Sequence, residues 1–303
     1  MLTTKETITS LQFNSDQSCF VAGRVDGFSI YHSDPFRELY RRTFADGYGV
    51  KLCSMLHKSS LIAFTGDSTT SLQQYIKDSV HQTSTNQSQN QSQKSFNTAN
   101  QFTPNVVFLY DDSAQKILGR IRFRSLVTSL QICDRFLVVG LSNQIFIHRL
   151  EDLQLLDVVQ ILEDSQFSCS SGEDLVLAFV SPRQTVGWNF YLTHSQADIT
   201  QQHVGKSLED KPEIGEIEIV KKESQQKCQC LKVSADGQLL LVFWDKQISL
   251  FQTVTKKQLS FYKQPLLVQS FAFNNNFFAA ICKNYVFVYE IPLRDPISFL
   301  KFL

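Results

Sequence analysis

A short pattern of extended segments recurs along the chain at intervals of about 40 residues. In each copy an apolar run is followed by a polar turn, a second run, another turn, and a third run that ends in an aromatic residue or histidine. Four segments follow this pattern clearly: Ser10 to Tyr31, Val127 to His148, Cys230 to Phe251 and Ser270 to Tyr289. Repeats of this length built from strands and turns are typical of β-propeller blades, in which neighbouring four-stranded sheets cover one another.

The individual runs have the character of strands. Most are 4 to 6 residues of Val, Ile, Leu, Phe and Tyr bounded by Asn, Asp, Ser or Gly, and no long stretch follows the 3.6-residue period of a helix. They comprise Ile8 to Phe13, Cys19 to Ala22, Gly27 to Tyr31, Leu61 to Phe64, Val106 to Tyr110, Phe136 to Gly140, Gln144 to Arg149 and Val176 to Val180. The sequence therefore predicts an all-β fold.

The repeat predicts one domain over residues 1–303, a seven-bladed WD-repeat-type β-propeller. Six blades can be assigned, with an incomplete last one: residues 8–45, 50–122, 126–162, 166–204, 227–263 and 266–303. The turns Asn14 to Gln17 and Ser234 to Gly237 place Asx and Gly residues where hairpins reverse. Residues 68–104 are rich in Ser, Thr, Asn and Gln and are predicted to form a disordered loop inserted in the second blade. Residues 195–226 are predicted to link two blades, with strand character at 214–220.

Composition limits the function classes. The chain has 29 Lys plus Arg and 29 Asp plus Glu, so no global positive field favours nucleic acid. Its seven Cys are odd in number and form no CxxC pair, which argues against a disulfide framework or zinc site and favours a reducing, cytoplasmic setting. The polar N-terminus and the lack of about 20 consecutive apolar residues predict a protein neither secreted nor membrane-spanning, with peripheral membrane contact left open.

Catalytic signatures are also missing from the sequence. The six histidines show no HExxH or other close metal spacing, and neither a GxSxG elbow nor a glycine-rich phosphate loop occurs. We therefore expect a non-enzymatic protein with no catalytic residues, no metal site and no cofactor.

Two passages resemble the PROPPIN family of WD-repeat propellers. The segment Ser10 to Phe36 contains Phe-Asn-x-Asp, Cys-Phe, Gly-Phe-x-Ile-Tyr and Asp-Pro-Phe in the order found in the family. The segment Asn105 to Leu156 resembles the family's sequence from the second to the third blade. The segment Val176 to Phe179 in the fourth blade resembles the family's sequence more weakly. The resemblance implies a cytoplasmic propeller, peripheral on autophagic or endosomal membranes, that binds phosphatidylinositol 3-phosphate or 3,5-bisphosphate. It also implies recruitment of autophagy proteins, including a lipid-transfer protein.

The family's lipid sites are built around a Phe-Arg-Arg-Gly motif at the end of blade five, where each arginine helps to hold one headgroup. The corresponding residues here are Phe261, Tyr262, Lys263 and Gln264. Lysine lacks the bidentate fork of arginine, so the motif is degenerate. At most one weakened site, centred on Lys263 with Lys256 and Lys257 nearby, is expected.

Three other groups of residues have two interpretations each. The family inserts an apolar loop of blade six into the bilayer, and Phe299, Leu300 and Phe302 are candidates for this role or for a buried strand. Arg120, Arg122 and Arg124 alternate on one strand face and form either a partner-docking rim, as in the family, or a solvated face. Arg41 and Arg42 are expected at a solvated strand end.

Three hypotheses follow for the function. The chain is a lipid-binding membrane adaptor, a scaffold that has lost lipid binding, or a generic WD-repeat platform in an unrelated complex. The order of preference is the order given.

Overall fold

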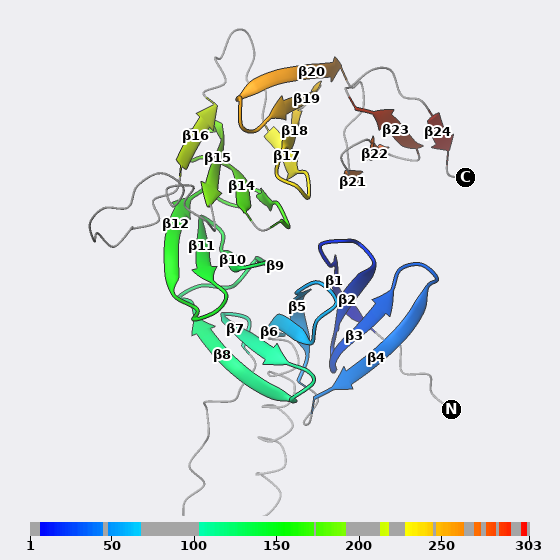
Figure 1. The fold of residues 1–303 in the computed structure, drawn as a ribbon, viewed down its shortest axis with the longest axis vertical. Helices are drawn as coiled ribbons and strands as arrows, with labels where there is room; N and C mark the ends of the chain where they lie inside the picture. Colours follow the sequence, from blue (N-terminus) through cyan, green and yellow to red (C-terminus); the bar gives the residue numbers. More distant parts are fainter. Residues whose placement is uncertain are drawn as a thin grey trace, which may run out of the picture. The chain divides into compact units, whose positions relative to one another are not determined.

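The structure is a computed structural model that describes residues 7–44, 48–67, 103–172, 174–191, 213–217, 228–244, 247–263, 270–273, 277–282, 285–291 and 298–301. Every regular element in these ranges is a β-strand, which confirms the all-β prediction. The described strands form six four-stranded sheets, each made of strands consecutive in the sequence. Figure 1 labels the strands of each sheet.

The first two sheets have their strands in sequence order. The first contains β1 (Ile8–Phe13), β2 (Cys19–Arg24), β3 (Gly27–His32) and β4 (Arg37–Thr43). The second contains β5 (Val50–Met55), β6 (Leu61–Gly66), β7 (Val106–Asp111) and β8 (Lys116–Arg122). The predicted inserted loop, residues 68–104, falls between β6 and β7 and lies outside the described residues apart from Thr103 and Pro104.

The third and fourth sheets follow. The third contains β9 (Ser129–Cys133), β10 (Phe136–Gly140), β11 (Gln144–Arg149) and β12 (Leu155–Gln160). The fourth contains β13 (Ser168–Cys169), β14 (Leu175–Val180), β15 (Val186–Tyr191) and β16 (Glu213–Ile217). The prediction that this blade ends at residue 204 is wrong. β16 pairs with β15 from Val186↔Ile217 to Phe190↔Glu213 and supplies partners for backbone groups that would otherwise form an open edge.

The last two sheets also have four strands each. The fifth contains β17 (Cys228–Val233), β18 (Leu239–Trp244), β19 (Gln247–Gln252) and β20 (Lys257–Lys263), and the sixth contains β21 (Ser270–Phe273), β22 (Phe277–Cys282), β23 (Tyr285–Glu290) and β24 (Ser298–Lys301). The expectation of an incomplete sixth blade is therefore wrong, because β24 pairs with β23 and completes the sheet. The count of seven blades stays a prediction.

The predicted hairpin turns are confirmed. The backbone N–H of Gln17 donates to the carbonyl of Asn14, and the N–H of Gly237 donates to the carbonyl of Ser234. Gly237 has φ +74°, and a Cβ there would lie 2.7 Å from Cγ2 of Val176. Only glycine satisfies both the positive φ and this close approach without strain.

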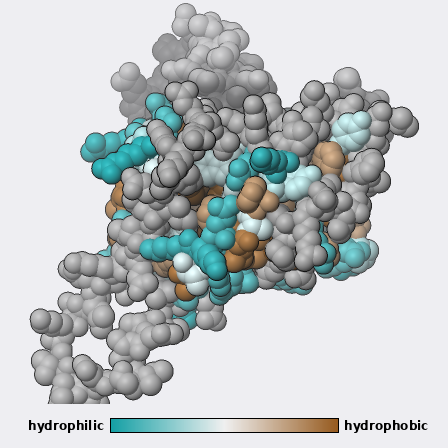
Figure 2. Space-filling view, turned by 90° about the horizontal axis from the view of Figure 1, so that it is seen from above, coloured by the Kyte–Doolittle hydropathy of each residue, from teal (hydrophilic) through white to brown (hydrophobic). Residues whose placement is uncertain are grey.

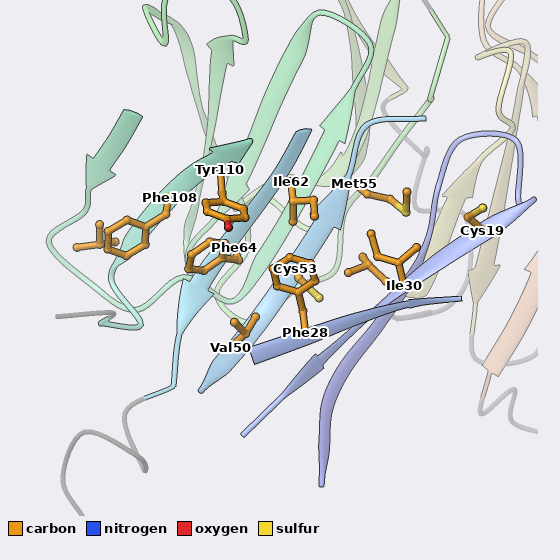
Figure 3. Close-up of a cluster of buried hydrophobic side chains, with 12 residues drawn as sticks. Cys19, Phe28, Ile30, Val50, Cys53, Met55, Ile62, Phe64, Phe108 and Tyr110 are labelled. Carbon is orange, nitrogen blue, oxygen red and sulfur yellow. The ribbon is translucent and has the colours of Figure 1, made fainter. Parts of the chain in front are cut away.

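The chain divides into two compact units, residues 1–132 with 137–141 and residues 133–136 with 142–303. The core of the first unit lies between the first and second sheets, where Phe28 and Ile30 of β3 face Ile62 and Phe64 of β6 (Figure 3). Phe64 stacks on Phe108 with ring centroids 5.4 Å apart. The first and second sheets therefore bury apolar side chains against each other.

The second unit has cores of the same kind. Trp188 of β15, which is fully buried, packs among residues of the fourth and fifth sheets. Phe243 of β18 packs with Phe278 and Tyr289 of the sixth sheet, and the last two rings stack 4.4 Å apart. Strands β17, β18 and β19 of the fifth sheet thus contribute to buried clusters on both faces of the sheet.

The edge strands β4, β8 and β20 share one pattern of exposure and one irregularity. In each, the pairing with the preceding strand skips one residue, which is Leu39, Leu118 or Leu259. A β-bulge of this kind leaves the extra residue unpaired and bends the strand. The three leucines are 41%, 52% and 45% exposed, so each edge strand presents a leucine to solvent.

Candidate functional site

The degenerate motif lies at the end of β20, the edge strand of the fifth sheet. Phe261 pairs with Ser249, Tyr262 with Ile248 and Lys263 with Gln247 of β19. Because side chains alternate along a strand, Phe261 and Lys263 share one face and Tyr262 lies on the other. Phe261 and Lys263 are both exposed, whereas Gln264 lies outside the described residues.

Tyr262 occupies the position of the motif's first arginine and packs against the sixth sheet. Its ring centroid is 5.2 Å from that of Tyr289 at an interplanar angle of 61°. The side chain joins the apolar cluster of Phe243, Phe278 and Tyr289 as a partly buried member. This edge-to-face contact is a favourable aromatic geometry, and it fills the side of β20 on which the first arginine would lie.

The three predicted docking arginines lie at the end of β8 and just beyond it. Arg120 pairs with Phe108 and Arg122 with Val106, so these two share a face, while Arg124 follows the strand. All three are exposed. The backbone N–H of Phe123 donates to the carbonyl of Asn105 over 2.8 Å, and Asn105 Nδ2 donates to the carbonyl of Phe123 over 3.1 Å. These bonds hold the segment between Arg122 and Arg124 in place.

Arg41 and Arg42 differ from each other. Arg41 pairs with Glu38 of its own strand at 2.9 Å and is a third exposed, as expected for a solvated strand end. Arg42 is similarly exposed, at 30%, but its guanidinium also donates two hydrogen bonds to Asp112. Asp112 is 9% exposed, and its carboxylate raises the pKa of Arg42. Nothing in the sequence signals this pair, whose members are 70 residues apart.

The C-terminal candidates for membrane insertion fall partly on a strand. Phe299 pairs with Phe287 and Leu300 with Val286 in the β23–β24 ladder. Their backbones therefore follow the second of the two interpretations, a strand of the sixth sheet. Phe302 lies outside the described residues.

The described part of the chain contains no cluster of three or more His, Cys, Asp or Glu arranged to bind a metal ion. In the same residues no helix has the length and apolar character to cross a bilayer. Figure 2 shows apolar residues between hydrophilic ones on one face of the molecule. Exposed large apolar side chains of the described residues include Leu118, Leu259 and Phe261.

Repeated four-stranded antiparallel sheets of consecutive strands are the architecture of the WD-repeat-type propellers. No family model matches the chain. SVP1-like protein 2 of Pichia angusta is 23% identical over 77% of this chain and 53% of its own length. Autophagy-related protein 18 of Mycosarcoma maydis is 25% identical over 58% and 33%. The chain thus spans about half or less of the length of these curated relatives.

Solved structures share the fold. Hsv2 of Kluyveromyces marxianus aligns with a TM-score of 0.66 at 15% identity, covering 97% of this chain and 75% of Hsv2. KlAtg21, solved in complex with the coiled coil of AgAtg16, aligns with a TM-score of 0.66 at 17% identity over 98% of this chain and 85% of its own. The chain therefore shares the fold of these solved structures and is similar in sequence to SVP1-like and autophagy-related proteins.

Proposed function

We propose that the chain is the core of a non-enzymatic peripheral membrane adaptor that binds phosphatidylinositol 3-phosphate or 3,5-bisphosphate and recruits autophagy proteins. Its place of action would be the cytoplasm and the surface of autophagic or endosomal membranes. The resemblance to the PROPPIN family, the autophagy-related relatives and the shared fold support this role. The observation that carries the proposal is the exposed Lys263 at the end of β20, in the position of the motif's second arginine.

The proposal assigns one lipid site to the chain. Lys263 and Phe261 share a face of β20, whereas Tyr262 packs on Tyr289 at the opposite face. The proposed phosphate-binding residue is therefore Lys263, with Phe261 beside it on the same face and Gln264 following it in the sequence. A lysine ammonium is a point charge that cannot grip a phosphate bidentately as a guanidinium does. Binding weaker than that of a two-arginine site is the expected consequence.

Protein recruitment is assigned to Arg120, Arg122 and Arg124. KlAtg21 is recorded in complex with the coiled coil of AgAtg16, which supports autophagy proteins as a class of partner. Exposed arginines form strong charge-assisted hydrogen bonds with carboxylates. These three arginines therefore suit an acidic segment of an autophagy protein, and a lipid-transfer protein is one such partner. Replacing all three with alanine should abolish capture of that partner while leaving vesicle binding unchanged.

One observation favours a second candidate function, a scaffold without lipid binding. The partly buried aromatic side chain at position 262 packs against the apolar cluster of the fifth and sixth sheets, and this packing offsets the loss of an arginine there. A propeller under selection for protein docking alone would tolerate such a replacement. The two candidates differ in whether the unmodified protein binds lipid.

Sedimentation with phosphatidylcholine vesicles, with and without phosphatidylinositol 3-phosphate, separates them. The adaptor predicts that the phosphoinositide increases the bound fraction and that Lys263→Ala removes the increase. Lys232→Ala is the matched control, because Lys232 is also exposed but lies on β17, the opposite edge of the same sheet. No phosphoinositide-dependent binding of the unmodified protein would favour the scaffold.

A further inference from the structure

We propose that the β19–β20 hairpin, residues 247–263, contacts anionic lipid bilayers and inserts Leu259 and Phe261 at the headgroup boundary. This inference rests on the proposed membrane function and identifies the apolar part of the contact. It assigns insertion to an edge of the fifth sheet, whereas Phe299 and Leu300 of the C-terminal segment belong to a paired strand.

The first observation is charge. Residues 247–263 contain Lys256, Lys257 and Lys263 and no Asp, Glu, Arg or His, which gives a local net charge of +3 in a chain whose net charge is 0. All three lysines are exposed. Basic residues next to a bilayer are attracted to anionic lipids, each contributing about a fivefold increase in binding.

The equivalent hairpins of the first two sheets lack this purely basic character. The β3–β4 hairpin contains Asp34 and Glu38, and the β7–β8 hairpin contains Asp111 and Asp112. In those hairpins the acids form ion pairs with the arginines, Glu38 with Arg41 and Asp112 with Arg42. The uncompensated charge of the β19–β20 hairpin is therefore a property of its sequence and not of the repeat.

The second observation is exposed apolar surface between these lysines. Leu259 is 45% exposed at the bulge of β20, and Phe261 is 56% exposed two residues further along. The same hairpin supplies Leu250 and Phe251 to buried clusters. The exposed Leu259 and Phe261 are not members of these clusters. Large apolar side chains flanked by lysines are the combination that enters the boundary between headgroups and acyl chains.

The third observation is that the hairpin is held rigidly on its sheet. Trp188 Nε1 donates to the carbonyl of Thr253 over 3.0 Å, and Thr253 Oγ1 donates to the carbonyl of Gly237 over 2.6 Å. Thr253 is fully buried. A rigid support presents Leu259 and Phe261 without an additional ordering cost on binding.

A bilayer suits this surface better than a protein partner does. The proposed headgroup residue Lys263 lies on the same strand face as Phe261, so phosphate binding and apolar insertion are continuous along one edge. The charge is of one sign along the whole hairpin, which complements a uniformly anionic surface. An acidic protein segment is the competing occupant and is included as an outcome of the test.

Vesicle binding of the full chain provides the first test, with phosphatidylcholine vesicles, the same with phosphatidylserine, and the latter with phosphatidylinositol 3-phosphate added. We expect Leu259→Ser/Phe261→Ser to weaken binding to both anionic vesicles by about tenfold, because inserted apolar surface is lost. Lys256→Ala/Lys257→Ala should weaken it comparably and reduce its salt dependence. Leu118→Ser is the matched control, with the same residue type at the same bulge of β8 and 52% exposed; it should bind as the unmodified protein does.

Phe261→Trp gives a direct measure of depth. Its fluorescence should shift to the blue on anionic vesicles and be quenched by brominated phosphatidylcholine. A tryptophan that stays unquenched on sedimenting vesicles, or unchanged binding of the double serine variant, would overturn the insertion. Capture of an acidic peptide that requires Leu259 and Phe261, without vesicle binding, would overturn it in favour of a protein partner.

The two proposals can fail separately. Equal binding to anionic vesicles with and without the phosphoinositide would contradict the proposed headgroup specificity while supporting insertion. Phosphoinositide-dependent binding that survives Leu259→Ser/Phe261→Ser would contradict insertion while supporting the proposed headgroup specificity.

Discussion

Arg42 of β4 holds the carboxylate of Asp112, the residue after β7, with two nearly parallel hydrogen bonds, Nε to Oδ1 at 2.7 Å and a terminal guanidinium nitrogen to Oδ2 at 2.9 Å. Asp112 is buried, so an unpaired carboxylate there would be costly. The fork therefore ties the first sheet to the second, within the first compact unit.

Replacing Arg42 should destabilise the protein markedly. We expect Arg42→Ala to lower the free energy of unfolding by about 1–3 kcal/mol, because it leaves a buried carboxylate without its partner. Arg42→Lys should recover only part of the loss, since lysine cannot form the fork. The measurement is urea unfolding followed by circular dichroism. Arg41→Ala is the control and should cost less than about 0.5 kcal/mol; equal losses for the two arginines would contradict the assignment.

Glu38 should titrate below the ordinary glutamate range. The hydrogen bond from Arg41 is the main cause of its lowered pKa. A lowered folded-state pKa means that the stabilisation is present above the unfolded-state pKa and is lost as the pH falls through the folded-state value. Carboxyl NMR titration should show this pKa rising toward the ordinary value in Arg41→Ala. An unchanged pKa in that variant would show that Arg41 is not the cause.

Trp188→Phe should loosen the β19–β20 hairpin. The substitution removes the indole donor to the carbonyl of Thr253 and leaves a small cavity in a fully buried position. We expect a loss of about 1–3 kcal/mol and faster amide hydrogen exchange in residues 247–263. Exchange that increases everywhere except in this hairpin would contradict the proposed anchoring.

Cysteine reactivity should follow burial. Cys53 and Cys133 are buried, and burial raises the pKa of Cys53 to about 12. The neighbouring thiol of Cys169, with Sγ 3.4 Å away, and burial raise the pKa of Cys133. Thiolates are the reactive form, so native-state alkylation at neutral pH should label the half-exposed Cys228 well before these two. Mass spectrometry that finds Cys133 labelled first would contradict this order.

The sequence predicts the strands made of apolar runs well and the polar edge strands poorly. β1, β10 and β11 have the bounds expected from their apolar runs, Ile8–Phe13, Phe136–Gly140 and Gln144–Arg149. For the edge strands β4 and β8 the sequence indicates only strand character at a few arginines, and for β20 it predicts no bounds, because most of their side chains are exposed and need not be apolar. The bulges at Leu39, Leu118 and Leu259 also interrupt the alternation by which strands are recognised.

The candidate site shows the same division. Its location at Phe261, Tyr262 and Lys263 follows from the resemblance to a known motif. The contact of Tyr262 with Tyr289 and the pairing of Arg42 with Asp112 depend on which sheets meet in space. No local pattern encodes such contacts between residues distant in the sequence, so they required the structure.

The most direct test of the central claim is calorimetric titration of the protein with inositol 1,3-bisphosphate, the soluble headgroup of phosphatidylinositol 3-phosphate. Using a free headgroup separates phosphate recognition from insertion by Leu259 and Phe261. The account predicts saturable binding that weakens about tenfold in Lys263→Ala, through loss of a charge-assisted hydrogen bond, and is unchanged in Lys232→Ala. No saturable binding, or equal binding by Lys263→Ala, would contradict it.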